Sequence, residues 1–166
     1  MRVFVAFDEG ESARHAKALI RRVAPDELCD TELYLLDQLA APASENAVTY
    51  SGSEADLFII ALRAGYSLTQ PVRTWLSSLL TLRDCDQEGA LVVLLSGAKS
   101  HTEANAELLA YMETLAILGP LDFFAVRMES NVASVTGLTA VPEANIAEFT
   151  ATIHAPDALR GWGINA

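Results

Sequence analysis

The sequence has few cysteines and no long apolar segment. Its 166 residues include two cysteines, Cys29 and Cys85, and neither has a Cys or His at metal-ligand spacing. We therefore expect no disulfide framework and no zinc site, but ordinary reduced thiols in a cytoplasmic protein. The apolar run Met1–Phe7 is too short for a signal-peptide core, and no stretch reaches the length of a membrane-spanning helix.

Basic residues are also scarce. There are 11 Lys and Arg against 22 Asp and Glu, which gives a formal net charge of −11. A field of this sign repels phosphate backbones and anionic lipid surfaces, so we expect neither a nucleic-acid partner nor a membrane partner. The apolar fraction of 51% is enough for a sizeable core and leaves surface for a protein partner or for self-association.

Complete catalytic and nucleotide-binding motifs are absent. Neither G-x-G-x-x-G nor G-x-x-x-x-G-K-[ST] follows the first apolar run, and no G-x-S-x-G elbow occurs. The turn after that run carries Asp8, Glu9 and Glu11, which would repel a phosphate by several kcal/mol in a partly shielded pocket. These acids suit a helix N-terminus, and Asp8 and Glu9 also suit a divalent cation such as Mg²⁺. Both interpretations remain open.

The order of the segments is the most informative feature that the sequence does have. Short buried runs predict strands at Arg2–Phe7, Glu32–Leu36, Asp56–Leu62, Ala90–Leu95 and Phe123–Met128. Helical spacing predicts a first helix that stops at Pro25 and a short or irregular helix within residues 40–54. A third helix is expected to be capped by Thr69 with Pro71 in its first turn, and a fourth to begin at Ser100 and Glu103 and to end at Gly119-Pro120. A last helix is expected near Pro142, with its buried side chains at Ile146, Phe149 and Ile153.

Strands that alternate with helices predict a three-layer, doubly wound α/β fold. Five strands at this length favour a parallel sheet of order 2-1-3-4-5, in one domain that spans residues 1–166. In such a sheet, ligands bind beyond the carboxyl ends of the strands, at the switch point between the first and third strands. The ligand-binding candidates are the residues that follow these ends, namely Asp8, Glu9, Ser12, Arg63, Tyr66, Ser67, Ser96, Gly97 and His101.

Three side chains near this edge leave alternatives open. His15 lies one turn into the first helix, on the side of Ser12, and a solvent-facing position is the simpler expectation. His101 precedes a helix, where a charged imidazole would oppose the helix dipole, so a structural role competes with a catalytic one. Tyr66 is expected either to stack on the ring of a ligand or to pack on Trp75. Away from this edge, Trp162 is expected to anchor the C-terminal tail.

Four segments resemble response-regulator receiver domains. Asp8–Arg14 is similar to the acidic turn that holds magnesium in that family. Ala55–Arg63 resembles the strand that bears the phosphorylated aspartate in receiver domains. Val92–Gly97 resembles the receiver strand that ends in a hydroxyl residue, and Gly119–Ala125 resembles the segment that leads to the family's lysine. Ala61 stands at the phosphoacceptor position and Val126, beside Arg127, at that of the lysine. The resemblance therefore implies a receiver-like domain that cannot accept a phosphoryl group.

A second resemblance is to the NADPH-dependent FMN reductase and flavodoxin group. The segment Tyr66–Trp75 is similar to the loop and helix start that cover the flavin ring in that group, and 97–101 would frame a second flavin-side loop. The family's proline falls at Thr69, whereas this chain has Pro71, and the acidic turn replaces the family's hydroxyl-rich phosphate loop. The chain also resembles bacterial flavodoxin-like proteins of unknown function that end in a motif like Trp162-Gly163.

Three functional hypotheses follow. The first is a non-catalytic, receiver-like regulatory or protein-interaction domain, because Ala61 replaces the phosphoacceptor. The second is an FMN-binding oxidoreductase, because of the Tyr66–Trp75 segment. A small acidic scaffold that associates with itself through an apolar helix face is a third. No residue is assigned a catalytic role, and FMN or Mg²⁺ would be the cofactor if there is one.

Overall fold

Five parallel strands form a single sheet of order β2-β1-β3-β4-β5 in the computed structural model. The structure describes residues 1–25, 28–39, 45–84, 86–97 and 103–128. The strands are β1 (Arg2–Phe7), β2 (Asp30–Leu35), β3 (Leu57–Arg63), β4 (Ala90–Ser96) and β5 (Asp122–Met128), and the helices are α1 (Gly10–Val23), α2 (Leu36–Leu39), α3 (Glu45–Ser53), α4 (Gln70–Thr81) and α5 (Glu103–Leu118). The predicted fold class and strand order are confirmed.

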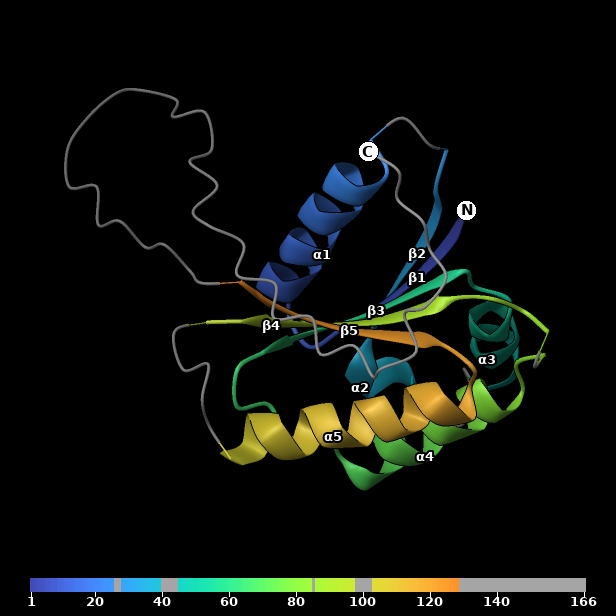
Figure 1. The fold of residues 1–166 in the computed structure, drawn as a ribbon. Coiled ribbons are helices and arrows are strands. Elements are labelled where there is room, and N and C mark those ends of the chain that lie inside the picture. Colours follow the sequence, from blue (N-terminus) through green and yellow to red (C-terminus); the bar gives the residue numbers. More distant parts are fainter. Residues whose placement is uncertain (26–27, 40–44, 85, 98–102, 129–166) are drawn as a thin grey trace, which may run out of the picture.

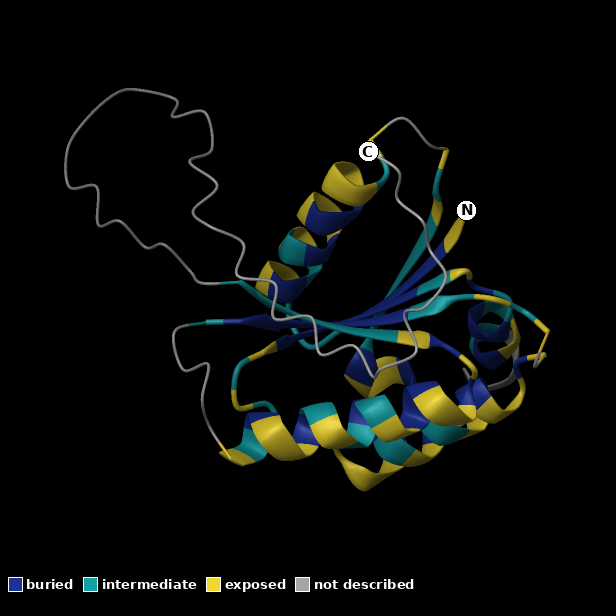
Figure 2. Cartoon of the chain, viewed as in Figure 1, coloured by how far each residue is buried: buried dark blue, intermediate teal, exposed yellow. Residues whose placement is uncertain are grey.

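Helices cover the two faces of the sheet unequally in the described part of the chain. Helix α1 lies on one face, and α2, α3, α4 and α5 lie on the other (Figure 1). The alternation of β3 explains how one strand serves both faces: Phe58, Ile60 and Leu62 pack with α4 and α5, whereas Ile59 and Ala61 pack with α1. The centre of the sheet is buried on both sides, as Figure 2 shows.

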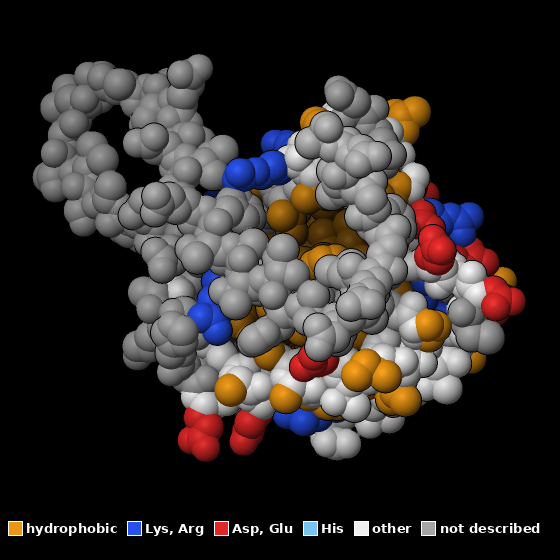
Figure 3. All heavy atoms as spheres, in the orientation of Figure 1, with side chains coloured by type: hydrophobic (Ala, Val, Ile, Leu, Met, Phe, Trp, Pro, Cys, Tyr) orange, Lys and Arg blue, Asp and Glu red, His pale blue; other side chains and the backbone are white. Residues whose placement is uncertain are grey.

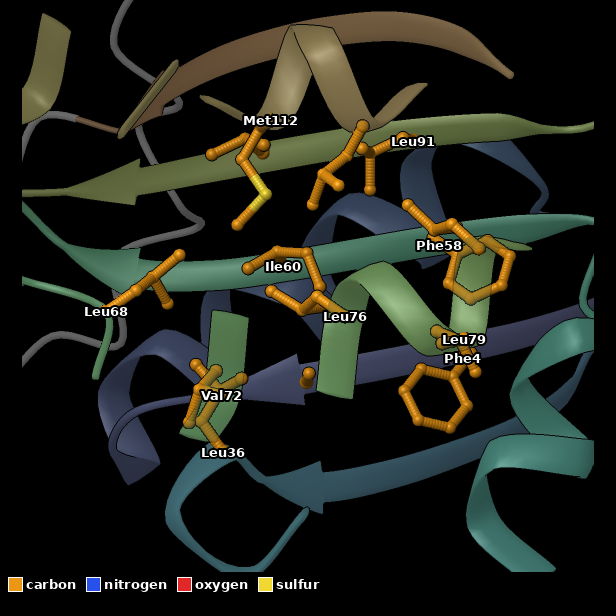
Figure 4. Close-up of a cluster of buried hydrophobic side chains, with 14 of the residues drawn as sticks. Phe4, Leu36, Phe58, Ile60, Leu68, Val72, Leu76, Leu79, Leu91 and Met112 are labelled. Atoms are coloured by element: carbon orange, nitrogen blue, oxygen red, sulfur yellow. The ribbon is translucent and has the colours of Figure 1, made fainter. Parts of the chain in front are cut away.

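The larger core lies under α4 and α5. Its side chains include Phe4, Phe58, Ile60, Leu76 and Met112 (Figure 4). Phe4 stacks on Trp75 with ring centroids 6.0 Å apart, and the Trp75 indole N–H donates to Oγ1 of Thr49 over 3.0 Å. The buried indole thus keeps a hydrogen bond while its ring fills the core.

Helix boundaries differ from the predictions in small ways with local causes. Helix α2 begins at Leu36, which was expected to end the second strand, because Leu36 turns into the core and is fully buried. Helix α4 has Thr69 at its N-cap and Pro71 in its first turn as predicted, but the Thr69 side chain makes no capping hydrogen bond. The expected cap is wrong in that detail, and proline alone marks this helix start.

Some predictions lie outside the described residues. These are Ser100 in the capping box, Cys85, the last helix near Pro142 with Ile146, Phe149 and Ile153, and the tail with Trp162. Cys29 is a free, half-buried cysteine. Within the ranges that the structure describes, none of the helices combines the length and the apolar character needed to cross a membrane.

Candidate functional site

The carboxyl ends of β1, β3 and β4 meet at one edge of the sheet. The strand register places Phe7 beside Ala61, Ala61 beside Leu94, and Arg63 beside Ser96. The backbone of Asp8 continues this pairing, because its N–H donates to the carbonyl of Ala61 over 3.3 Å. Asp8, Arg63 and Ser96 therefore follow neighbouring strands at the predicted switch point.

Asp8 is almost completely buried at this edge. Its side chain is 2% exposed, and Oδ2 accepts the backbone N–H of Arg63 over 3.1 Å and lies 3.5 Å from the Arg63 Nε. Its other oxygen, Oδ1, is buried and has no hydrogen-bond partner among the described residues. A buried carboxylate needs such partners because its charge has been taken out of water.

The Arg63 guanidinium spans the acidic pair. Its Nη1 lies 3.6 Å from Oε2 of Glu9, while its Nε faces Asp8, and the Arg63 side chain itself is 61% exposed. A divalent cation at Asp8 and Glu9 would have to compete with this guanidinium. In the described ranges, no three His, Cys, Asp or Glu side chains gather as metal ligands would.

Ala61 is an interior residue of β3. It is fully buried among residues that α1 covers, and the strand continues to Arg63. The residue at the carboxyl end of β3 is thus a cation rather than a phosphoacceptor. Val126, at the position of the receiver lysine, is half-buried and packs against the same apolar cluster.

His15 faces the sheet rather than the solvent. Its Nδ1 lies 2.8 Å from Oγ of Ser96, so the expectation of a solvent-facing histidine is wrong. Ser12, one turn earlier on α1, is fully buried, and its Oγ has no hydrogen-bond partner within the described ranges. The period of the helix, which sets Ser12 and His15 on one side, explains why both meet the strand ends.

Tyr66 lies in the loop after β3 and is half-buried. Its hydroxyl donates to Oδ1 of Asp37 over 3.4 Å, and the guanidinium carbon of Arg63 lies 6.0 Å from its ring centroid. Burial, followed by the charges of Asp37 and Asp8, raises the pKa of the Tyr66 phenol. The ring packs against the core cluster that contains Trp75, and Ser67 beside it is exposed.

Two glycines shape the loops at this edge. Gly65 has φ +83° and Gly97 has φ +118°, so both adopt backbone conformations that favour glycine. The Gly65 N–H donates to Oδ1 of Asn105 over 2.7 Å, and the Gly97 N–H donates to the carbonyl of Met128 over 3.1 Å. His101 lies outside the described residues.

Asn105 and Asp37 also make contacts at this edge, and neither was among the residues that the sequence indicated. Asn105 is 2% exposed and ties α5 to the loop after β3. Its sequence signal is an amide on the apolar stripe that continues through Leu108 and Met112, because a buried amide on such a stripe needs a partner. Asp37 gives no comparable signal, because nothing in its local sequence points to Tyr66.

Comparison with known proteins gives the fold. No protein-family model and no curated protein sequence matches the chain. Among solved structures, it is similar to the Flv1 flavodiiron core from Synechocystis sp. PCC6803, with TM-score 0.53 and 16% identity over 78% of this chain and 30% of that chain. It is also similar to the Trp repressor binding protein from Bacillus subtilis, with TM-score 0.50 and 12% identity over 78% of this chain and 85% of that one.

A flavodoxin from Streptococcus pneumonia TIGR4 matches with TM-score 0.48 and 11% identity over 74% of this chain and 78% of that chain, a score too low to support an argument. The strand order and the two better matches define a flavodoxin-like α/β protein. At these identities the likeness extends to the fold alone, and function has to be argued from the site.

Proposed function

We propose that this chain is a non-catalytic, receiver-like regulatory or protein-interaction domain that cannot accept a phosphoryl group. One observation carries the proposal: Arg63, at the end of β3, lies within 3.5 Å of Asp8 and 3.6 Å of Glu9. In a receiver domain the corresponding acidic pair holds magnesium. Here a guanidinium of the same chain lies beside both carboxylates and offsets one of their two charges.

The chemistry of phosphoryl acceptance supports this proposal. A phosphoaspartate forms only where a carboxylate oxygen can attack, with a cation to compensate the charge on the phosphoryl group. Ala61 offers a methyl group and is fully buried, and Arg63 already pairs with both members of the acidic pair. The domain would therefore act through contact rather than through phosphotransfer.

Exposed apolar side chains support a role in protein contact. Leu82 after α4 is 63% exposed, and Ile117 and Leu118 at the end of α5 are 74% and 64% exposed. The ends of the two helices approach each other, because a Cβ placed on Gly119 would lie 3.2 Å from Cβ of Leu80. Apolar residues that gather on a surface are typical of interaction sites.

Intact-mass spectrometry after incubation with acetyl phosphate and Mg²⁺ tests the proposal. We expect the mass of the chain to stay unchanged, while an authentic receiver domain in the same tube gains one phosphoryl group. A phosphoryl group on any aspartate of this chain, located by peptide mapping, would overturn the proposal.

FMN binding is the second candidate function, and the position of Tyr66 favours it. The ring is half-buried at the switch point, in a loop that Gly65 turns with a positive φ. The acidic start of α1 opposes it, because Asp8, Glu9 and Glu11 would surround the FMN phosphate. A rise in melting temperature with FMN, lost in Tyr66→Ala, would favour this candidate over the first.

A further inference from the structure

A cavity of about 300 Å³ opens at the amino edge of the sheet, opposite the switch point. It lies between the starts of β1 and β2 and the end of α3. The residues that line it are Arg2, Val3, Phe4, Asp30, Glu32, Tyr50, Ser51, Glu54 and Ala55. Ligand pockets range from roughly 300 to 1,000 Å³, so this one has room for a small ligand only.

The cavity has an apolar floor and an aromatic wall. Phe4 and Ala55 are 1% and 2% exposed and form the floor on the α3 side of the sheet, whereas the Val3 side chain packs in the cluster on the α1 face. Tyr50 lines the cavity and is 67% exposed, so much of its side chain is open to solvent there. A floor of this kind suits a short aliphatic chain, and an open aromatic face attracts a cation.

Glu32 is held in place by two hydroxyl groups. Its Oε2 accepts hydrogen bonds from Oγ of Ser51 over 2.6 Å and from the hydroxyl of Tyr34 over 2.8 Å. These neutral donors fix the carboxylate without neutralising it. Among the described residues no Lys or Arg pairs with Glu32, and Arg2, at the same cavity, pairs with Glu54.

The charge around the cavity favours a positive ligand. Asp30, Glu32 and Glu54 line the cavity together with one arginine, Arg2, which pairs with Glu54. Exposed acids also stand at or just before the starts of the other strands, at Asp56, Glu88 and Asp122. Figure 3 shows acidic side chains gathered beside α3 and the strand starts. Such an edge attracts cations and repels anions.

We propose that this cavity binds a small organic cation, a primary ammonium group on a short aliphatic chain. Glu32 is its ion partner, the Tyr50 ring lies beside the ammonium group, and the apolar floor takes the alkyl chain. A metal ion fits less well, because the described residues hold no group of three metal-ligating side chains. A free amine and a lysine side chain of another protein share this chemistry. This inference is independent of the switch point.

Calorimetric titration with butylamine tests the cavity, with butanol as the neutral analogue and MgCl₂ as a control for charge alone. We expect butylamine to bind, and its affinity to fall about tenfold in Glu32→Gln because a charge-assisted hydrogen bond is lost. Glu107→Gln removes the same charge from an exposed position on α5 and should leave the affinity unchanged. Butanol should give no binding heat.

A second variant keeps the test decisive if Glu32→Gln fails to fold. Tyr50→Ala removes an exposed ring and should also weaken butylamine binding. The absence of butylamine binding would overturn the proposal, as would equal affinity in wild type and Glu32→Gln or equal competition by MgCl₂. A lysine derivative blocked at its α-amino and carboxyl groups distinguishes the sources: binding as tight as that of butylamine indicates a protein side chain, and weaker binding a free amine.

Discussion

The imidazole of His15 and the hydroxyl of Ser96 join the first helix to the fourth strand. Nδ1 of His15 lies 2.8 Å from Oγ of Ser96, across 81 positions of the sequence. Ser96 is 6% exposed and ends β4, so this contact fixes the start of α1 over the carboxyl edge of the sheet. Glu9 is the N-cap of the same helix, so the position of Glu9 depends partly on this hydrogen bond.

Ser96→Ala should lower the free energy of unfolding by about 1 kcal/mol, because the His15 nitrogen loses its partner in a half-buried setting. Urea denaturation measures the change. Thr114→Ala is a matched control, because this exposed hydroxyl bonds only to its own helix, over 2.9 Å. A double-mutant cycle with His15→Ala that shows no coupling would mean that the contact does not form in solution.

Arg63→Ala should destabilise the protein by about 1 to 2 kcal/mol. Asp8 keeps its hydrogen bond from the Arg63 backbone but loses the compensating charge, while its side chain stays buried. Because the guanidinium is largely exposed, the cost falls below that of breaking a fully buried pair. In the control Arg2→Ala, which breaks the exposed pair with Glu54, the change should stay below about 0.5 kcal/mol. Equal effects of the two substitutions would contradict this account.

Arg83 is a buried polar side chain that joins several segments in the described part of the core. It is 7% exposed, donates to the carbonyls of Ser53, Ala55, Gln87 and Glu88, and lies 5.3 Å from the ring centroid of Phe58. Burial lowers the pKa of its guanidinium.

Arg83→Met should therefore cost about 3 kcal/mol, because two buried carbonyls, those of Ser53 and Ala55, and two half-buried ones lose their donor together. Arg73→Met is the comparison and should cost about 1 kcal/mol: among the described residues Arg73 donates to the carbonyl of Leu68, and its guanidinium carbon lies 4.9 Å from the Tyr111 ring centroid. Thermal or urea unfolding gives both values. A loss below that of Arg73→Met would show that water replaces the Arg83 contacts.

Alkaline pH should weaken the fold through Tyr34. Burial, and then the hydrogen bond to Glu32 and the charge of Glu32, raise the pKa of the Tyr34 phenol above its ordinary value of 10.0. This contribution to stability is complete below pH 10.0 and is lost as the pH rises through the folded-state pKa. Tyr34→Phe should reduce the loss of stability above that pH, measured by urea denaturation at several pH values. An unchanged slope would contradict the assignment.

The sequence predicted the fold well because the strands carry their own signal. Continuous apolar runs such as Leu91–Leu95 are typical of strands buried on both faces, and the alternation with helices leaves few topologies. The boundaries of the elements were predicted less well. Leu36 has the local sequence of a strand end, but it begins α2 because its side chain is buried in the core, and packing overrides local preference there.

The sequence placed several candidate residues at one edge of the sheet but did not predict the contacts between them. The switch-point rule correctly placed Asp8, Arg63 and Ser96 along one edge. That Arg63 turns back onto Asp8, and that His15 meets Ser96, depend on side-chain directions across strands that are distant in sequence. The cavity at the opposite edge was not predicted, because the rule that ligands bind beyond the carboxyl ends of the strands does not apply to the amino ends.

The most direct test of the central claim is an NMR titration with MgCl₂ that follows the backbone amides of Asp8 and Glu9 and the Arg63 Nε–H. If the guanidinium compensates the acidic pair in solution, these three signals keep their positions, apart from the small drift that a matched rise in ionic strength also gives. Saturable shifts of all three at the same Mg²⁺ concentration would show that the cation displaces Arg63, and would contradict the account.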